Sequence, residues 1–346
     1  MGTDGFEFIE YTAPDPAALA ALFEQLGFQR VARHRSKQVA LYRQGDINFI
    51  LNSEPDSFAR SFARVHGPSV CAMAFRVRDA AAALEHGLSL GARAESGPVG
   101  AMELNIPAIR GIGGSLIYLV DRYGERTIYD VDFLPEPDVP AAPAGVGLAA
   151  VDHLTHNVHR GRMAEWVEFY ERLFGFREIR TFHIAGRMTG LHSKALVSPC
   201  GKIRIPINES ADDRSQIEEY LAAYHGEGIQ HIALATADIY ATVEALAARG
   251  IRFLDTPDTY YELVQQRLAD HGEPIERLKS DRIQIDGTPG RDGKRLLQIF
   301  TETVIGPIFF EIIQRKGDEG FGEGNFQALF EAMELDQVRR GVLKPE

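Results

Sequence analysis

The chain has 346 residues, a length typical of two domains, and its hydrophobic (45%) and charged (25%) fractions are those of a globular protein with a buried core. Its formal net charge of −12 disfavours nucleic acid as a partner, and the absence of any apolar run of about 18 residues disfavours a membrane span. Cys71 and Cys200 form no CxxC motif, so thiolate zinc sites are excluded, and we expect a cytoplasmic protein without a signal peptide.

Both halves of the chain open with the same pattern of elements. The run FEFIEY predicts a strand, and Asp15-Pro16 predicts the start of a helix that ends at Gly27. In the second half, VDHLTHNV predicts the corresponding strand, and the amphipathic helix that follows ends at Gly175.

Two further pairs of segments match between the halves. Residues 71–93 and 230–252 each contain a strand, an aspartate cap and an alanine-rich helix, and residues 115–124 match residues 308–317. We therefore predict an internal duplication, with two strand–helix–strand modules in each half. The proline-rich segment 134–147 predicts a linker between domains at 1–133 and 148–346, and a last helix is expected at about 325–340.

The duplication brings three metal-binding residue types together. His153 lies in the first strand of the third module, and His231 and Glu311 lie in the first and last strands of the fourth. If equivalent strands pack as repeats, these side chains converge, and two imidazoles with one carboxylate are the donor set of non-haem Fe(II) oxygenases.

Glu311 lies within the apolar strand IFFEII, where an unpaired carboxylate costs several kcal/mol. Either a metal ion or a salt bridge to Arg204 or Arg315 accounts for it, and both alternatives stay open at this point. In the first half, Ala72 aligns with His231 and Tyr118 with Glu311, so we expect the chemistry in residues 150–346.

Two His-Gly-Glu sequences, His225–Glu227 and His271–Glu273, fit half of a jelly-roll oxygenase motif. Three-residue patterns are common by chance, and we interpret both as surface loops.

Five motifs in this order and spacing resemble the 4-hydroxyphenylpyruvate dioxygenase family of the vicinal oxygen chelate superfamily: VDHLTHNV, GIQHIALAT, LLQIFT, FFEIIQRKG and GFGEGNFQALFEA. The resemblance implies an α+β fold of four βαβββ modules, paired into two open barrels, with a C-terminal helix. It also implies that the first domain serves as scaffold and oligomer contact, in a homodimer or homotetramer.

The implied reaction converts 4-hydroxyphenylpyruvate and O2 to homogentisate and CO2 in tyrosine catabolism. By match to the family motifs, one Fe(II) per chain is held by His153, His231 and Glu311, and the 2-oxo acid of the substrate chelates it.

Further positions match the substrate pocket of the family. Ser193, Asn208 and Gln298 match its polar lining, and Phe300 and Phe326 match apolar walls beside the substrate ring. Gln230 is expected to lie behind its neighbour His231. The glycine-rich segment GFGEG is expected to act as a hinge for a gating C-terminal helix, with Glu323 where a basic residue is expected.

Three rivals remain at the level of sequence. A 4-hydroxymandelate synthase shares the fold, the ligands and the substrate, and an extradiol ring-cleaving dioxygenase shares the superfamily. A metal-free binding protein of the same fold is the third, although the presence of all three ligands in one half is unfavourable to it.

Overall fold

The computed structural model describes most of the chain, namely residues 1–97, 99–100, 102–185, 190–269, 271–287, 293–325 and 327–329. The predicted helix at about 325–340 falls largely outside the described residues, although residues 323–325 and 327–329 have helical backbone. No helix in the described ranges is both long and apolar enough to cross a membrane.

The first half contains two modules, each with one strand, one helix and three more strands. The first module consists of β1 (Thr3–Thr12), α1 (Pro16–Gln25), β2 (Gln29–His34), β3 (Val39–Gln44) and β4 (Ile47–Asn52). The second consists of β5 (Ser69–Val77), α3 (Ala80–Ser89), β6 (Ala94–Glu95), β7 (Ala108–Arg110) and β8 (Leu116–Val120). Helix α2 (Phe58–His66) connects them, and a 3-10 turn, α4 and β9 complete this half at Ile112–Gly114, Tyr129–Asp132 and Phe133–Pro135.

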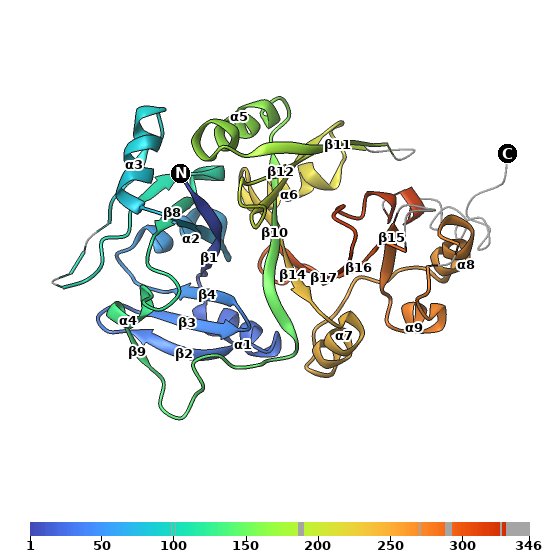
Figure 1. Ribbon diagram of the computed structural model, residues 1–346, viewed down its shortest axis with the longest axis horizontal. Helices are drawn as coiled ribbons and strands as arrows, with labels where there is room; N and C mark the ends of the chain where they lie inside the picture. The colour runs from blue at the N-terminus through green and yellow to red at the C-terminus, as the bar shows by residue number, and fades with distance from the viewer. Residues whose placement is uncertain are drawn as a thin grey trace.

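The second half repeats this order. The third module consists of β10 (Leu148–Val158), α5 (Met163–Phe174), β11 (Arg177–Ala185), β12 (Gly190–Val197) and β13 (Arg204–Ser210). After α6 (Gln216–Tyr224), the fourth consists of β14 (Gly228–Thr236), α7 (Ile239–Ala248), β15 (Gln284–Gly287), β16 (Arg295–Phe300) and β17 (Phe309–Lys316). Helices α8 (Asp258–Arg267) and α9 (Ile275–Ser280) are inserted before β15 and lie at the end of the molecule away from the first half (Figure 1).

The strand order of the two sheets shows the duplication directly. Among the described residues, the first sheet runs β6-β7-β8-β5-β1-β4-β3-β2-β9, and the second runs β11-β12-β13-β10-β14-β17-β16-β15. Read in the reverse direction, the second sheet matches the first strand for strand, except for β9. The four βαβββ modules in two sheets confirm the predicted fold class.

Aspartates begin the helices where the sequence predicts them. The side chain of Asp15 accepts hydrogen bonds from two amides of α1, Asp79 accepts one from α3, and Asp238 accepts one from α7. Each carboxylate satisfies amides that the first helical turn leaves without partners, an interaction typically worth about 1 kcal/mol.

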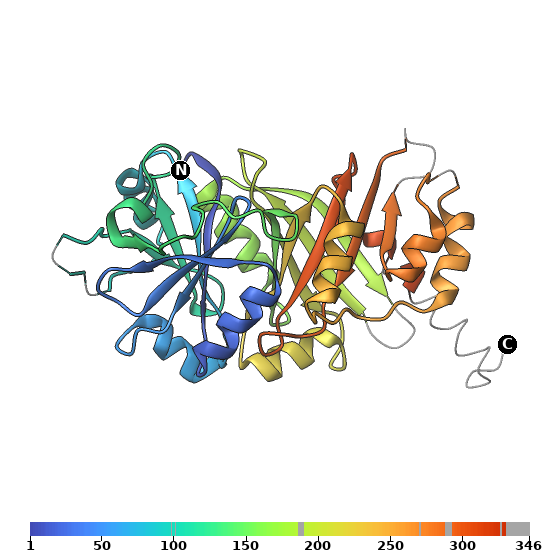
Figure 2. The same cartoon turned by 90° about the horizontal axis from the view of Figure 1, so that it is seen from below.

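The two halves lie side by side along the long axis of the molecule (Figure 2) and share one core. Phe75 packs edge-on against Phe174, and Phe49 stacks on Phe310. The division into domains at residues 134–147 stays a prediction. Leu134 and Pro135, the first residues of the predicted linker, belong to β9.

The interpretation of the two His-Gly-Glu sequences as surface loops is wrong for their glutamates. Glu227 is buried and accepts hydrogen bonds from the Trp166 indole and the His159 amide. Glu273 is buried as well and pairs with Arg295 and with Lys316. These partners lie in other elements. His271 is buried too, whereas His225 is exposed, and both tripeptides lie in loops as interpreted.

Candidate metal centre

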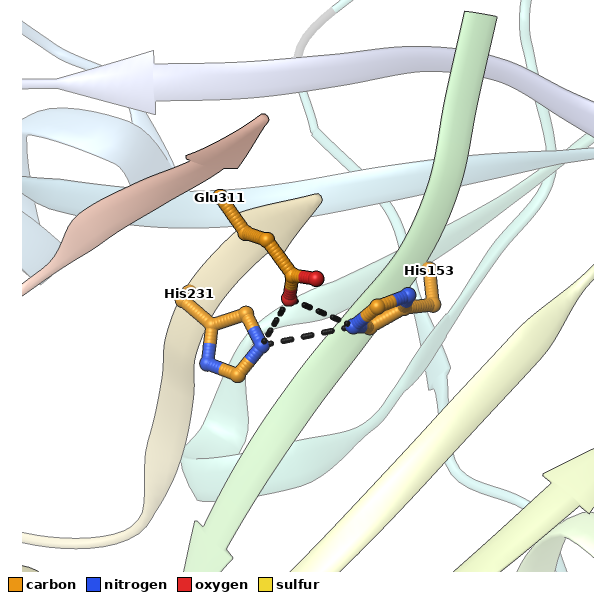
Figure 3. A group of neighbouring side chains, drawn as sticks. All are labelled: His153, His231 and Glu311. Atoms are coloured by element: carbon orange, nitrogen blue, oxygen red, sulfur yellow. Dashed lines mark hydrogen bonds and ion pairs between the residues drawn. The ribbon is translucent and has the colours of Figure 1, made fainter. Parts of the chain in front are cut away.

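Three adjacent strands in the middle of the second sheet carry the predicted ligands. In the strand register, His153 of β10 lies opposite Ala233 of β14, which in turn lies opposite Glu311 of β17. His231 is two residues from Ala233, so its side chain points to the same face of the sheet. The three side chains therefore converge, as Figure 3 shows.

The distances between the three donor atoms fit a metal ion. Glu311 Oε2 lies 3.2 Å from His153 Nε2 and 3.3 Å from His231 Nε2, and the two nitrogens are 3.3 Å apart. Donor atoms on one face of an octahedral metal, with bonds of about 2.1 Å, lie about 3.0 Å from one another. A small contraction of this group would give metal-ligand geometry.

The hydrogen bonds of the two imidazoles engage Nδ1 of each ring and leave Nε2 facing the predicted metal site. His153 Nδ1 donates to Asp152 Oδ1 at 2.8 Å, and His231 Nδ1 donates to Gln230 Oε1 at 3.0 Å. With Nδ1 of each ring engaged in this way, Nε2 is the nitrogen that faces the centre of the group. The Thr155 hydroxyl also lies 3.0 Å from His231 Nε2.

Charge within the group favours an ionised carboxylate. Burial opposes ionisation of Glu311, but the nearby imidazoles outweigh it and lower its pKa to about 2. Burial also opposes protonation of His153, yet the charges of Glu311 and Asp152 raise its pKa. For His231 burial dominates, and its pKa is lowered.

Neither arginine proposed as an alternative partner pairs with Glu311. Arg315 forms its ion pair with Asp152, and Arg204 lies near Asp152 and Glu319. Glu311 Oε1 is buried and has no hydrogen-bond partner among the described residues. A buried carboxylate oxygen without a partner is costly, and a metal ion would relieve that cost.

The three predicted ligands line one pocket together with several predicted substrate residues. Ser193, Asn208 and Phe300 are in this lining, whose full membership among the described residues is His153, Thr155, Phe182, Leu191, Ser193, Pro206, Asn208, His231, Phe300, Glu311, Phe321 and Glu323. Gln298 and Gln230 are not among the lining residues: Gln298 is buried beside Gly322, and Gln230 lies behind His231. Phe326 lies outside the described residues.

Sequence reasoning missed other members of this lining. Thr155 and Phe321 contact the ligand histidines, and Phe182 lies opposite Ser193, which lies opposite Asn208. Strand alternation from His153 places Thr155 on the pocket face, so the sequence contained a signal for that residue. Phe321 belongs to the glycine-rich segment, where no periodicity indicates which way a side chain points.

The same positions of the first sheet hold no ligand set. Phe8 and Tyr118 occupy the positions of His153 and Glu311, and their rings pack 5.5 Å apart. Ala72 stands where His231 stands in the second sheet. Among the described residues, His153, His231 and Glu311 form the one group of three metal-binding side chains whose donor atoms lie close together.

Comparisons with known proteins agree with this arrangement. The model of the N-terminal domain of hydroxyphenylpyruvate dioxygenase matches residues 1–134, and that of the Glyoxalase/Bleomycin resistance protein/Dioxygenase superfamily matches residues 150–273. A protein named hemolysin VllY from Vibrio vulnificus is 62% identical, and a 4-hydroxyphenylpyruvate dioxygenase from Pseudomonas aeruginosa is 60% identical. Each alignment covers 99% of this chain and 97% of the relative.

A solved structure supports the same fold. A mutant of 4-hydroxymandelate synthase from Streptomyces coelicolor superposes with a TM-score of 0.83 at 25% identity, covering 97% of this chain and all of that one. Fold and donor set thus define an enzyme of the vicinal oxygen chelate superfamily, with two histidines and one glutamate at its centre. Within it, the chain belongs to the 4-hydroxyphenylpyruvate dioxygenase family.

Proposed function

We propose that this chain is an Fe(II)-dependent dioxygenase that converts 4-hydroxyphenylpyruvate and O2 to homogentisate and CO2, a step of tyrosine catabolism. The observation that carries the proposal is the convergence of two histidines and one glutamate in a buried pocket. Relatives named 4-hydroxyphenylpyruvate dioxygenase, at 57% and 60% identity over nearly the whole chain, support the choice of substrate.

His153, His231 and Glu311 would hold one Fe(II) per chain. Both imidazoles turn Nε2 toward the centre of the group and would give up any proton on it when the metal binds, and the carboxylate is ionised. When bound, the iron supplies activation of O2 and coordination of the 2-oxo acid of the substrate. The three residues that would hold the ion come from adjacent strands in one wall of the pocket, and the rest of the pocket would be available to these two molecules.

Polar side chains in the pocket lining and next to it would orient the substrate by hydrogen bonds. Ser193 and Asn208 lie directly opposite each other on neighbouring strands. Gln298 is buried, and its Oε1 has no partner among the described residues. An unpaired buried amide costs about 1–3 kcal/mol, and a hydrogen bond from a bound molecule would recover it. Gln230 would act indirectly, by orienting the His231 ring.

Aromatic side chains would hold the ring of the substrate and exclude water. Phe300 lies opposite Glu311 in the sheet, and Phe321 packs edge-on against His153. We propose that Phe300 and Phe326 flank the substrate ring. Exclusion of water protects a reactive oxidising centre from side reactions. We propose that the segment beyond Gly320 closes the pocket for this purpose.

A second candidate is 4-hydroxymandelate synthesis, which uses the same substrate but hydroxylates the benzylic carbon. The structural similarity to the synthase mutant supports this second candidate, because the fold and the predicted ligands do not distinguish between the two reactions. Homo-oligomeric assembly and a cytoplasmic location stay predictions.

The test is reconstitution with Fe(II) in the absence of air, followed by addition of 4-hydroxyphenylpyruvate and O2 and identification of the product by chromatography and mass. We expect homogentisate, and none with His231→Ala. Formation of 4-hydroxymandelate would instead identify a synthase. Iron binding without either product would show that the substrate is wrong, and other 2-oxo acids and catechols would be tested next.

A further inference from the structure

The residue before the first histidine ligand lies directly behind that ligand. Asp152 is 6% exposed, and its Oδ1 accepts the Nδ1 proton of His153 at 2.8 Å. Arg315 binds the same carboxylate with two donors, Nε to Oδ2 at 2.7 Å and Nη2 to Oδ1 at 2.8 Å. The planar guanidinium therefore fixes the carboxylate, and the carboxylate fixes the plane and tautomer of the ligand imidazole.

Arg315 also binds residues 318–322, which include the start of the glycine-rich motif and are here called the hinge segment. Its Nη1 donates to the carbonyl oxygens of Asp318 at 3.1 Å and Gly320 at 2.6 Å. The guanidinium carbon lies 5.6 Å from the Phe321 ring centroid, and that ring lies 5.3 Å from the His153 ring. One arginine thus contacts the hinge segment at three residues.

A second arginine links the same two places. Arg204 Nη1 lies 3.7 Å from Asp152 Oδ2, and Arg204 Nη2 lies 2.5 Å from Glu319 Oε2. The carboxylate behind His153 is therefore connected to the hinge segment through two cations from two different strands. A displacement of the hinge segment would disturb the hydrogen bonds that orient the ligand.

We propose that Asp152 and Arg315 are positioning residues that couple iron binding at His153 to docking of the hinge segment over the pocket, an inference that rests on the proposed iron site. Coupling between two sites is reciprocal. If docking of the segment improves the orientation of His153, iron binding must favour docking by the same factor. Binding of the metal would then favour the docked position of the hinge segment, in which Phe321 forms part of the pocket wall.

The first half supplies the competing explanation. Glu7, the residue before Phe8, is 3% exposed and pairs with Arg76 at 2.6 Å. Arg76 also lies over an aromatic ring, that of Tyr123. A buried carboxylate–arginine pair therefore occurs at the position equivalent to Asp152 without any ligand histidine beside it, although its arginine comes from β5, the counterpart of β14, and not from the counterpart of β17. If the second half follows this pattern, the Asp152–Arg315 pair only stabilises the fold. The test must therefore separate this structural role from the proposed coupling of iron binding to docking.

The experiment compares Asp152→Asn and Arg315→Lys with Glu7→Gln, the matched control from the first half. Two quantities are measured without air: Fe(II) affinity, by competition with a chelator, and hydrogen exchange of peptides that cover residues 316–325, with and without Fe(II). In the unaltered protein we expect Fe(II) to slow exchange in these peptides. Neither readout requires turnover.

We expect Asp152→Asn to weaken Fe(II) binding by about 10- to 100-fold, the usual effect of removing a partner of a ligand histidine. We also expect it to abolish the iron-dependent slowing of exchange. Arg315→Lys keeps the charge but loses the two-donor geometry. It is expected to lose most of the slowing with a smaller loss of affinity, and it serves as the test if Asp152→Asn does not fold. Glu7→Gln should lower the melting temperature and leave both readouts unchanged.

The coupling is overturned if the Asp152 and Arg315 variants bind Fe(II) as tightly as the unaltered protein and still show slower exchange. Equal losses in Glu7→Gln would overturn it too, because they would show a general effect of stability. Iron binding by the unaltered protein without slower exchange would overturn the coupling alone. Failure of the unaltered protein to bind iron would overturn the proposed function together with the coupling.

Discussion

The two sheets have the same strand order and differ at their centres. In the first sheet, Phe8 and Tyr118 pack against each other, and Tyr129 of α4 belongs to the same apolar cluster. In the second sheet, the equivalent positions hold His153 and Glu311. The first sheet shows that this order of strands forms with an aromatic pair in place of two of the predicted ligands. The fold itself therefore does not require a histidine and a glutamate at these positions, and their burial is explained by what they are proposed to bind.

The largest contrast is expected between Glu311→Gln and its counterpart Tyr118→Phe. The glutamine removes the only carboxylate of the donor set, so iron content and homogentisate formation should fall by about 10³-fold or more. The phenylalanine keeps the packing with Phe8 and should leave activity unchanged. Iron analysis and product assays check both. Comparable losses in the two variants would break the distinction between the halves.

A smaller effect is expected at two glycines, one in the segment that follows β17 and one in the segment that follows β8. Gly322 has φ +75°, and a Cβ there would overlap the Gln298 amide. Gly124 has φ +91° with open space around the added atom. Both replacements by alanine strain the backbone by about 1 kcal/mol. Only Gly322→Ala should also lower kcat/KM, by about 10-fold or more, with iron content retained. Steady-state kinetics test this difference. An equal loss of kcat/KM in Gly124→Ala would contradict the explanation by overlap with the Gln298 amide.

A pH-dependent effect on stability is expected in the first sheet. Glu10 lies opposite Ala72, as Thr155 lies opposite His231, and burial raises the Glu10 pKa above 4.5. Because the folded-state pKa is raised, the neutral carboxyl favours folding at low pH, and this contribution is lost as pH rises through the folded-state value.

Glu10→Gln should therefore raise the melting temperature near pH 8 and have little effect near pH 4.5. The Asn52 side chain, which donates to Glu10 at 2.7 Å, can also donate to the glutamine. Melting curves across this range test the sign. A stabilisation that grows toward low pH would show that Glu10 is ionised in the folded protein.

The smallest effect is expected at Glu323, which forms an ion pair with Arg180 of β11 near the pocket. Both side chains are partly exposed, and such pairs contribute about 0.2–1 kcal/mol and are weakened by salt. Glu323→Gln should change KM by less than about fivefold, and the difference should diminish in high salt. A large salt-independent change would assign the carboxylate a direct role with the substrate.

Matched motifs predicted the modules, the ligand strands and the aspartate caps, because these depend on local patterns repeated twice in the chain. The register of β1 was not predictable, and the counterpart of His153 was placed only within residues 6–8. The reason is physical: β1 pairs with β5 through register shifts on both sides of Phe6, and irregular pairing has no period in the sequence.

Long-range polar partners were also invisible to sequence reasoning. Asp152 and Arg315 are far apart in the chain, yet they form the closest ion pair behind the ligand. The burial of Glu227 and Glu273 likewise depends on partners in other elements. Side-chain pairing of this kind is determined by the three-dimensional packing of strands, and short motifs do not record it.

The three ligands are divided between two modules, since β10 belongs to the third module and β14 and β17 to the fourth. During folding, neither module alone offers more than two donors. The complete site requires the pairing of β10 with β14, which joins residues far apart in the chain. The ion would therefore bind at the junction between two modules that have already paired. An isolated module would form such a site only by pairing with a second module.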